Sequence, residues 1–183
     1  MNNKILIGGA VLIFGAMLIV GGLYRGSTAY TNSSLIHNGA SADRALATND
    51  AAPDFTLQKL NGGTISLSEF RGKKPVVVDF WASWCPNCRR DMPNLNRFYE
   101  KYKDKVEVIG VNLQERESVV EDFIKSRQIA FPIAFDPGGY ASSAFGIRYT
   151  NTHILIDKDG NLLRTIPGDI SETDIASLID AGT

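Results

Sequence analysis

Two kinds of apolar run organise this chain of 183 residues. The first is N-terminal, where residues 5–23 read ILIGGAVLIFGAMLIVGGL, without a charge or a proline. About 20 apolar residues span a bilayer as a helix, and a cleaved signal peptide has a shorter apolar region of roughly 7–15 residues. We therefore predict a transmembrane anchor within residues 1–26, with cleavage after the small residues 27–29 as the alternative.

Residues 27–52 are rich in Ser, Ala, Asn and Thr and show neither a helical nor a strand period, which predicts a flexible linker. Lys4 and Arg25 flank the apolar run and barely bias its orientation. A single span with the domain exported is the simplest topology. It would place the cysteines in a compartment where disulfides persist.

Shorter apolar runs predict a folded domain over residues 53–183. The segment FTLQKLNGGTISLS predicts an N-terminal β-hairpin that turns at residues 61–63. The runs PVVVDFWA and KVEVIGVNL are continuous and β-branched, as is typical of strands covered on both faces. Between them we predict a helix from Cys85 to about Lys103, with Pro93 as a kink.

The second half of the domain also alternates predicted helices and strands. ESVVEDFIKSRQ predicts an amphipathic helix, FPIAFD a strand and YASSAFG a short helix. HILIDKDGNLLRTIPG predicts a hairpin that turns at Asp159 and Gly160, and SETDIASLIDA a last helix with a capping box from Ser171 to Asp174. This order predicts an α/β domain of three layers around a central mixed sheet.

Composition and charge argue against several classes of function. The net charge of −1 gives no basic excess for nucleic acid and no acidic tail. The two cysteines, Cys85 and Cys88, are too close in sequence to staple the fold, because so short a loop removes little chain entropy. Zinc needs about four ligands, and neither His37 nor His153 has metal-type spacing, so no metal or cofactor is expected. We expect His153 to pack or to face solvent.

The cysteine pair lies where a buried strand ends and a helix begins. Free N–H groups and the dipole of a helix N-terminus stabilise a thiolate and lower its pKa. We therefore expect Cys85, at the cap, to be the exposed nucleophile and Cys88, one turn later, to resolve the mixed disulfide. Pro86 is tolerated in the first turn and stiffens it.

Asp79 interrupts the buried run VVVDFW. An enclosed carboxylate is costly, so its pKa should rise. We expect Asp79 to accept the proton of Cys88; the alternative is an edge position exposed to water. Trp84, which adjoins Cys85, is expected to shape a docking surface, whereas core packing explains Trp81.

The segment VVVDFWASWCPNCRRDMP resembles the active site of thioredoxin-like proteins, specifically the membrane-tethered thiol–disulfide oxidoreductases of the TlpA/ResA type. The resemblance extends from Ala52 to the C-terminus through APDFTLQKLNGGTISLSEFRGK, FPIAFDPGGYASSAFGIR and ILIDKDGNLLRTIPG. It implies a thioredoxin-like fold, a Cys85/Cys88 redox pair and a role for Asp91, where relatives often have Glu. It also implies exported thiol or disulfide protein substrates, apocytochrome c among them, and a membrane or extracytoplasmic electron donor. Asp79 matches the buried aspartate of thioredoxin itself.

One position departs from this family. Asn151, in IRYTNTHILID, stands where relatives place a cis-proline in a loop that faces the disulfide and binds the substrate backbone. A cis bond before a non-proline residue costs about 3–4 kcal/mol, so we expect a trans Thr150–Asn151 bond. We expect Thr150, Asn151, Trp84 and Pro86 to line the substrate site, with the Asn151 amide close to Cys85.

Three functions fit these observations. The leading hypothesis is a membrane-anchored extracytoplasmic thiol–disulfide oxidoreductase, with cytochrome c maturation as a candidate pathway. The second is a binding or assembly module whose exchange activity is reduced because Asn151 replaces the cis-proline. The third is peroxide reduction, since the PDFTL opening is shared with peroxiredoxins, although the position of the cysteine pair fits it less well.

Overall fold

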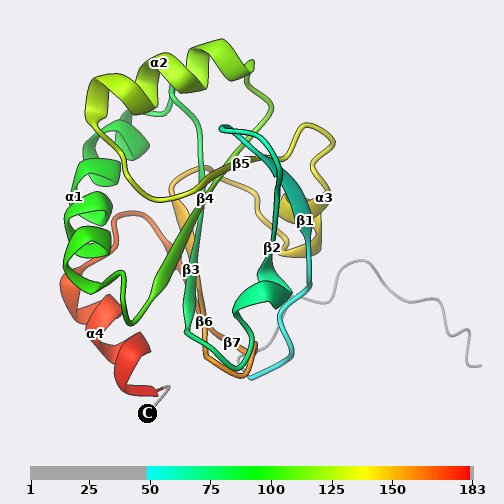
Figure 1. The fold of residues 1–183 in the computed structure, drawn as a ribbon, viewed down its shortest axis with the longest axis vertical. Coiled ribbons are helices and arrows are strands. Elements are labelled where there is room, and N and C mark those ends of the chain that lie inside the picture. Colours follow the sequence, from blue (N-terminus) through cyan, green and yellow to red (C-terminus); the bar gives the residue numbers. More distant parts are fainter. Residues whose placement is uncertain (1–48, 182–183) are drawn as a thin grey trace, which may run out of the picture. The chain divides into compact units, whose positions relative to one another are not determined.

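The computed structural model describes residues 49–181, and Figure 1 shows their fold. The predicted anchor and nearly all of the predicted linker lie outside this range. Within it, none of the helices combines the length and the apolar character that a membrane span requires.

A mixed sheet forms the centre of the described domain (Figure 1). Its strands are β1 (Thr56–Lys59), β2 (Thr64–Ser66), β3 (Val76–Trp81), β4 (Glu107–Asn112), β5 (Ile133–Phe135), β6 (Thr152–Ile156) and β7 (Leu162–Pro167). They lie side by side in the order β2-β1-β5-β4-β3-β6-β7. Strands β3, β4 and β5 run parallel, and β6 pairs with β3 in the antiparallel sense. The predicted N-terminal hairpin is confirmed as β1 and β2.

Helices cover both faces of this sheet (Figure 1). They are the 3-10 helix η1 (Leu67–Phe70) and the α-helices α1 (Pro86–Tyr102), α2 (Glu117–Arg127), α3 (Tyr140–Ala144) and α4 (Glu172–Ala181). Side chains of β3 alternate between two cores. Val77 and Trp81 pack with α1, α2 and α4, whereas Val78 and Phe80 pack with η1 and α3. The predicted three-layer arrangement is therefore confirmed.

Local signals in the sequence set several boundaries. Gly160 has a φ of 89°, a left-handed value that suits glycine in the tight turn between β6 and β7. At the start of α4 the Ser171 N–H donates to Asp174 Oδ2 at 2.9 Å, and the Asp174 N–H donates to Ser171 Oγ at 3.2 Å. This is the predicted capping box. Helix α1 continues past Pro93 as one element.

Gly110 of β4 is required by close packing beneath the site. A Cβ there would lie 2.8 Å from Ile133 Cδ1, 2.9 Å from Phe131 Cε2 and 3.2 Å from Trp81 Nε1. We expect Gly110→Ala to lower the free energy of unfolding by about 1–3 kcal/mol, since overpacking of a tight core costs that much. Chemical denaturation followed by tryptophan fluorescence measures this loss.

Gly138→Ala is the matched control for this substitution. The three atoms nearest to its Cβ would all belong to the ring of Tyr140, which is 81% exposed and free to rotate away. We expect a change within about 0.5 kcal/mol there, as is usual for surface positions. Equal losses in the two variants would show that the packing around Gly110 is not limiting.

Candidate active site

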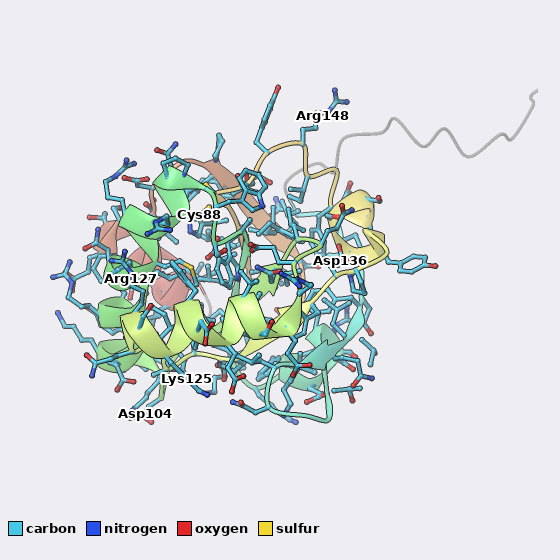
Figure 2. The ribbon with its side chains drawn as sticks, turned by 90° about the horizontal axis from the view of Figure 1, so that it is seen from above. Cys88, Asp104, Lys125, Arg127, Asp136 and Arg148 are labelled. Atoms are coloured by element: carbon cyan, nitrogen blue, oxygen red, sulfur yellow. The ribbon has the colours of Figure 1, made fainter. Side chains whose placement is uncertain are left out.

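Cys85 and Cys88 lie at the junction of β3 and α1, as predicted. Cys85 is the N-cap of α1, and its Sγ accepts the Cys88 N–H at 3.2 Å. Both side chains are free thiols. Cys88 is fully buried on the inner side of α1 (Figure 2), and Cys85 is only 5% exposed. The expectation of an exposed Cys85 is therefore wrong, because its sulfur turns over the helix end to act as the cap.

The two thiols are electrostatically unequal. Burial alone would raise the pKa of Cys85, but hydrogen bonds from the Cys88 thiol, the Thr150 side chain and the N–H groups of Cys88 and Asn87 lower it below its ordinary value. Burial, the contact with Cys85 and the charge of Asp79 raise the pKa of Cys88 to about 12. As pH rises, the thiolate therefore forms on Cys85 before it forms on Cys88.

A carboxylate from the next loop fixes the approach to Cys85. Glu115 accepts hydrogen bonds from the Ser83 N–H at 2.6 Å and from the Ser83 hydroxyl at 2.5 Å. It also accepts one from the Asn112 amide at 2.8 Å. This contact ties the β3–α1 loop to the end of β4. Sequence reasoning missed Glu115, because nothing near it in the chain distinguishes it from a solvated surface acid.

Asp79, Asp91 and His153 form a buried cluster beneath Cys88. Asp79 and His153 are direct partners in the register of β3 with β6. Asp91 lies one turn after Cys88 on α1. His153 Nε2 lies 3.4 Å from Asp79 Oδ1 and 3.3 Å from Asp91 Oδ2, and each side chain is at most 2% exposed.

This cluster decides two alternatives that the sequence left open. Asp79 is enclosed and does not sit at a wet sheet edge. His153 packs inside the domain and does not face solvent, and the antiparallel register turns it toward Asp79. A histidine within the strand THILI, just before the apolar residues 154–156, was the one available signal. Within residues 49–181 no set of three acids, cysteines or histidines is arranged to hold a metal ion.

The charges in the cluster perturb one another. Burial raises the pKa of Asp79 from its ordinary 3.8 to about 6; His153 opposes this rise and Asp91 adds to it. Burial would lower the pKa of His153, but attraction to Asp79 and Asp91 raises it above its ordinary 6.5. The rise for Asp79 therefore comes mainly from burial, whereas the rise for His153 comes from the carboxylates beside it.

Asn151 occupies its own conformation in the loop before β6. Its φ is 60°, in the left-handed region that asparagine tolerates better than most residues. Its N–H donates to the Phe80 carbonyl at 2.9 Å. Its amide donates to Asp169 Oδ1 at 3.1 Å, and Asp169 pairs with Arg90 of α1 at 2.8 Å. The amide expected beside Cys85 is thus bound to Asp169, and Thr150 contacts the thiol instead.

A groove opens beside Cys85. It encloses about 520 Å³ and is lined by Trp84, Leu113, Gln114, Ser142, Ile147, Arg148, Tyr149 and Thr150. Trp84 is 66% exposed and Tyr149 is 76% exposed. Arg148 projects outward from the same loop (Figure 2). The predicted residues Trp84 and Thr150 therefore meet at one surface, with Pro86 exposed nearby in the chain and Asn151 buried behind it.

The sequence matches the AhpC/TSA family over residues 48–165. The thiol–disulfide oxidoreductase ResA of Bacillus thuringiensis subsp. konkukian is 40% identical over 119 residues, which cover 64% of this chain and 68% of ResA. ResA of Halalkalibacterium halodurans is 39% identical over 133 residues, which cover 72% and 75% of the two chains.

Solved structures give the same result. A thiol:disulfide interchange protein described as DsbE, from Chlorobium tepidum, superposes with a TM-score of 0.68 at 34% identity, over 75% of this chain and 98% of that one. StoA from Bacillus subtilis superposes with a TM-score of 0.61 at 29% identity, over 69% and 96%. The fold is therefore thioredoxin-like, and the chain belongs to the AhpC/TSA family as a thiol–disulfide oxidoreductase of the ResA-like type.

Proposed function

We propose that this oxidoreductase is anchored in the cell membrane by residues 1–26 and works on the extracytoplasmic side. It exchanges disulfides with exported proteins through Cys85 and Cys88. The observation that carries the proposal is the cap geometry, in which Cys85 Sγ accepts the Cys88 N–H within the first turn of α1. The apolar run at residues 5–23 supports the anchor.

Exchange would begin at the sulfur with the lower pKa. The Cys85 thiolate attacks a substrate disulfide, and one substrate sulfur leaves as a thiolate. Cys88 then loses its proton and attacks Cys85 in the mixed disulfide. The Cys85–Cys88 bond forms, the bond to the substrate breaks, and the second substrate thiolate leaves with the electron pair. A membrane or extracytoplasmic donor would reduce the pair again.

Asp79 is the proposed acceptor of the Cys88 proton. Its charge is close enough to contribute to the high pKa of Cys88. Its own pKa of about 6 makes it a base that is mostly ionised at neutral pH yet able to hold a proton briefly. Asp91 lies one turn after Cys88 on α1. We propose that it acts through its contact with His153 and not on the sulfurs directly.

The groove beside Cys85 is the proposed docking surface. Trp84 and Tyr149 offer exposed aromatic area, and Thr150 reaches the reactive thiol. Pro86 is expected at the rim. Asn151 would shape this surface indirectly, by holding Thr150 in place through Phe80 and Asp169. Apocytochrome c is one exported thiol protein that such a surface would serve, which makes cytochrome c maturation a candidate pathway.

A second candidate is a binding or assembly module with reduced exchange, and the Asn151 loop favours it. In this loop the N–H of Asn151 is already bound to Phe80, which reorganises a segment that the family uses for substrates. A disulfide reduction assay separates the two functions. Turnover by the full chain supports the enzyme, whereas partner binding without turnover supports the module.

Unequal reactivity of the thiols is the first prediction of this proposal. In the reduced, folded chain we expect Cys85 to alkylate at least about 100-fold faster than Cys88 at neutral pH, because only Cys85 carries appreciable thiolate. Cys88→Ser should accumulate mixed disulfides on Cys85, and Cys85→Ser, the matched control, should not. Mass spectrometry of iodoacetamide adducts measures the alkylation rates, and mass spectrometry without reductant measures the mixed disulfides. Equal labelling of the two cysteines would contradict the assignment.

Asp79→Asn should slow exchange at pH 7 and remove the acidic limb of the rate profile near pH 6. It should also stabilise the fold. The raised pKa means that the folded domain binds this proton more tightly than the unfolded chain, so the stability it adds below about pH 4 is lost as pH rises through 6. We expect a gain on the order of 1–3 kcal/mol at pH 8.

Denaturation at pH 5 and pH 8 and turnover across this range measure both effects. Asp122→Asn, which removes an exposed acid of α2, is the matched control and should change neither. An Asp79→Asn rate profile that overlays that of the parent would assign Asp79 a purely structural part.

Removal of residues 1–26 tests the anchor. We expect the full chain in the membrane fraction and the shortened chain in the soluble fraction, with disulfide reduction retained, because the described core is built from residues after 49. Cell fractionation and an insulin reduction assay measure this. A full chain that is already soluble would refute the anchor, and a shortened chain that loses activity would show that the segment supports the domain.

A further inference from the structure

His153 has no part in the chemistry described so far, yet it occupies the centre of the buried cluster. Its Nε2 lies between two carboxylates, 3.4 Å from Asp79 Oδ1 and 3.3 Å from Asp91 Oδ2. Neither ring nitrogen makes a hydrogen bond of regular geometry within residues 49–181. Against the effect of burial, attraction to Asp79 and Asp91 and contacts with Asp91 and the Gly168 backbone all favour the protonated imidazole and raise its pKa.

The surroundings of the cluster supply few other charges. Across the sheet, β4 presents Gly110 opposite Asp79 and β7 presents Ile166 opposite His153. Helix α1 contributes Asp91 and Cys88. The connection from β7 to α4 contributes Asp169, whose pKa is lowered mainly by Arg90 and slightly by His153. His153 is thus the one buried cation among the groups that act on Asp79.

We propose that His153 is the positioning residue that keeps Asp79 ionised at neutral pH and so ready to take the proton of Cys88. Without the imidazolium, Asp79 would face only burial and the repulsion of Asp91, and both favour its protonated form. A protonated Asp79 cannot accept a second proton, so the resolving step would stall. The inference rests on the proposed role of Asp79.

The resolving step fixes where the proton goes. Cys88 passes its proton to the Asp79 carboxylate, and the new thiolate attacks Cys85 in the mixed disulfide. One S–S bond forms between the cysteines as the bond to the substrate breaks, and the substrate thiolate leaves with the electron pair and later takes up a proton. His153 loses no proton in this step. It supplies the charge that holds Asp79 in its basic form.

The experiment follows single turnover of the full-length, reduced chain with the small aromatic disulfide dithiobis(nitrobenzoate). A first coloured thiolate is released when Cys85 attacks, and a second when Cys88 resolves the mixed disulfide. We expect His153→Gln to move the acidic limb of the second phase toward alkaline pH by about 1–3 pH units, the usual effect of losing an adjacent opposite charge. The first phase should be unchanged.

Leu155→Val is the matched control. Leu155 is buried two residues further along the same face of β6, so this variant loosens the core without altering charge. In this variant the acidic limb of the second phase should lie at the same pH as in the parent. If His153→Gln leaves the limb in place while Asp79→Asn abolishes it, the role of His153 is overturned and that of Asp79 stands. If Asp79→Asn also leaves the limb in place, both roles fail.

A second measurement covers the case in which His153→Gln does not fold. The chain has two histidines, so His37→Gln leaves His153 as the single imidazole for NMR titration. Coupling between two sites is reciprocal, so adding Asp79→Asn should lower the midpoint of His153. An unchanged midpoint, or a neutral His153 at pH 7 in the parent, would overturn the proposal.

Discussion

Strand β3 is covered on both faces, and most of the site follows from that constraint. All six of its residues are buried, so their side chains alternate between two cores. The alternation that packs Val77 and Trp81 against α1 also turns Asp79 toward the helix that carries Cys88. Water cannot solvate a carboxylate there, so the group must be protonated or compensated by charge. The site is therefore arranged around Asp79, whose ionised form is unfavourable in a buried position.

Compensation comes from two different elements, and it is incomplete. The antiparallel register of β6 brings His153 opposite Asp79, while α1 adds a second acid, Asp91. Two acids and one base leave one negative charge without a partner, and burial raises the pKa of Asp79 to about 6. Exposed pairs such as Lys101 with Glu172 stay solvated, so their charges need no compensation from the fold. The cluster therefore links the packing of the sheet to the surroundings of Cys88.

Local sequence patterns predicted the features of the fold that are set by residues close together in the chain. Both buried strands, both hairpins and the cap at Ser171 follow from hydrophobic period and turn residues, and the site of Cys85 follows from the junction of two such elements. His153 could not be placed this way, because only the strand register reveals what it faces. The resemblance to the family marked Asn151 as unusual, but its left-handed φ and its bond to Asp169 depend on a segment that folds back from beyond β7.

The Asn151 loop shows how a different residue can hold the same place in the fold. Proline has a fixed φ near −65° and no N–H, so it could neither adopt the φ of 60° nor bond the Phe80 carbonyl. Asparagine does both and links the loop to α1 through Asp169 and Arg90. The Asp169 and Arg90 side chains are 43% and 59% exposed, so salt weakens their attraction. The buried charges beneath Cys88 are shielded from salt. The two cysteines are thus supported by interactions of different kinds. Cys85 contacts a loop that is held partly by the exposed Asp169–Arg90 pair, whose strength depends on salt. Cys88 lies above the buried cluster of Asp79, Asp91 and His153, whose charge depends mainly on pH.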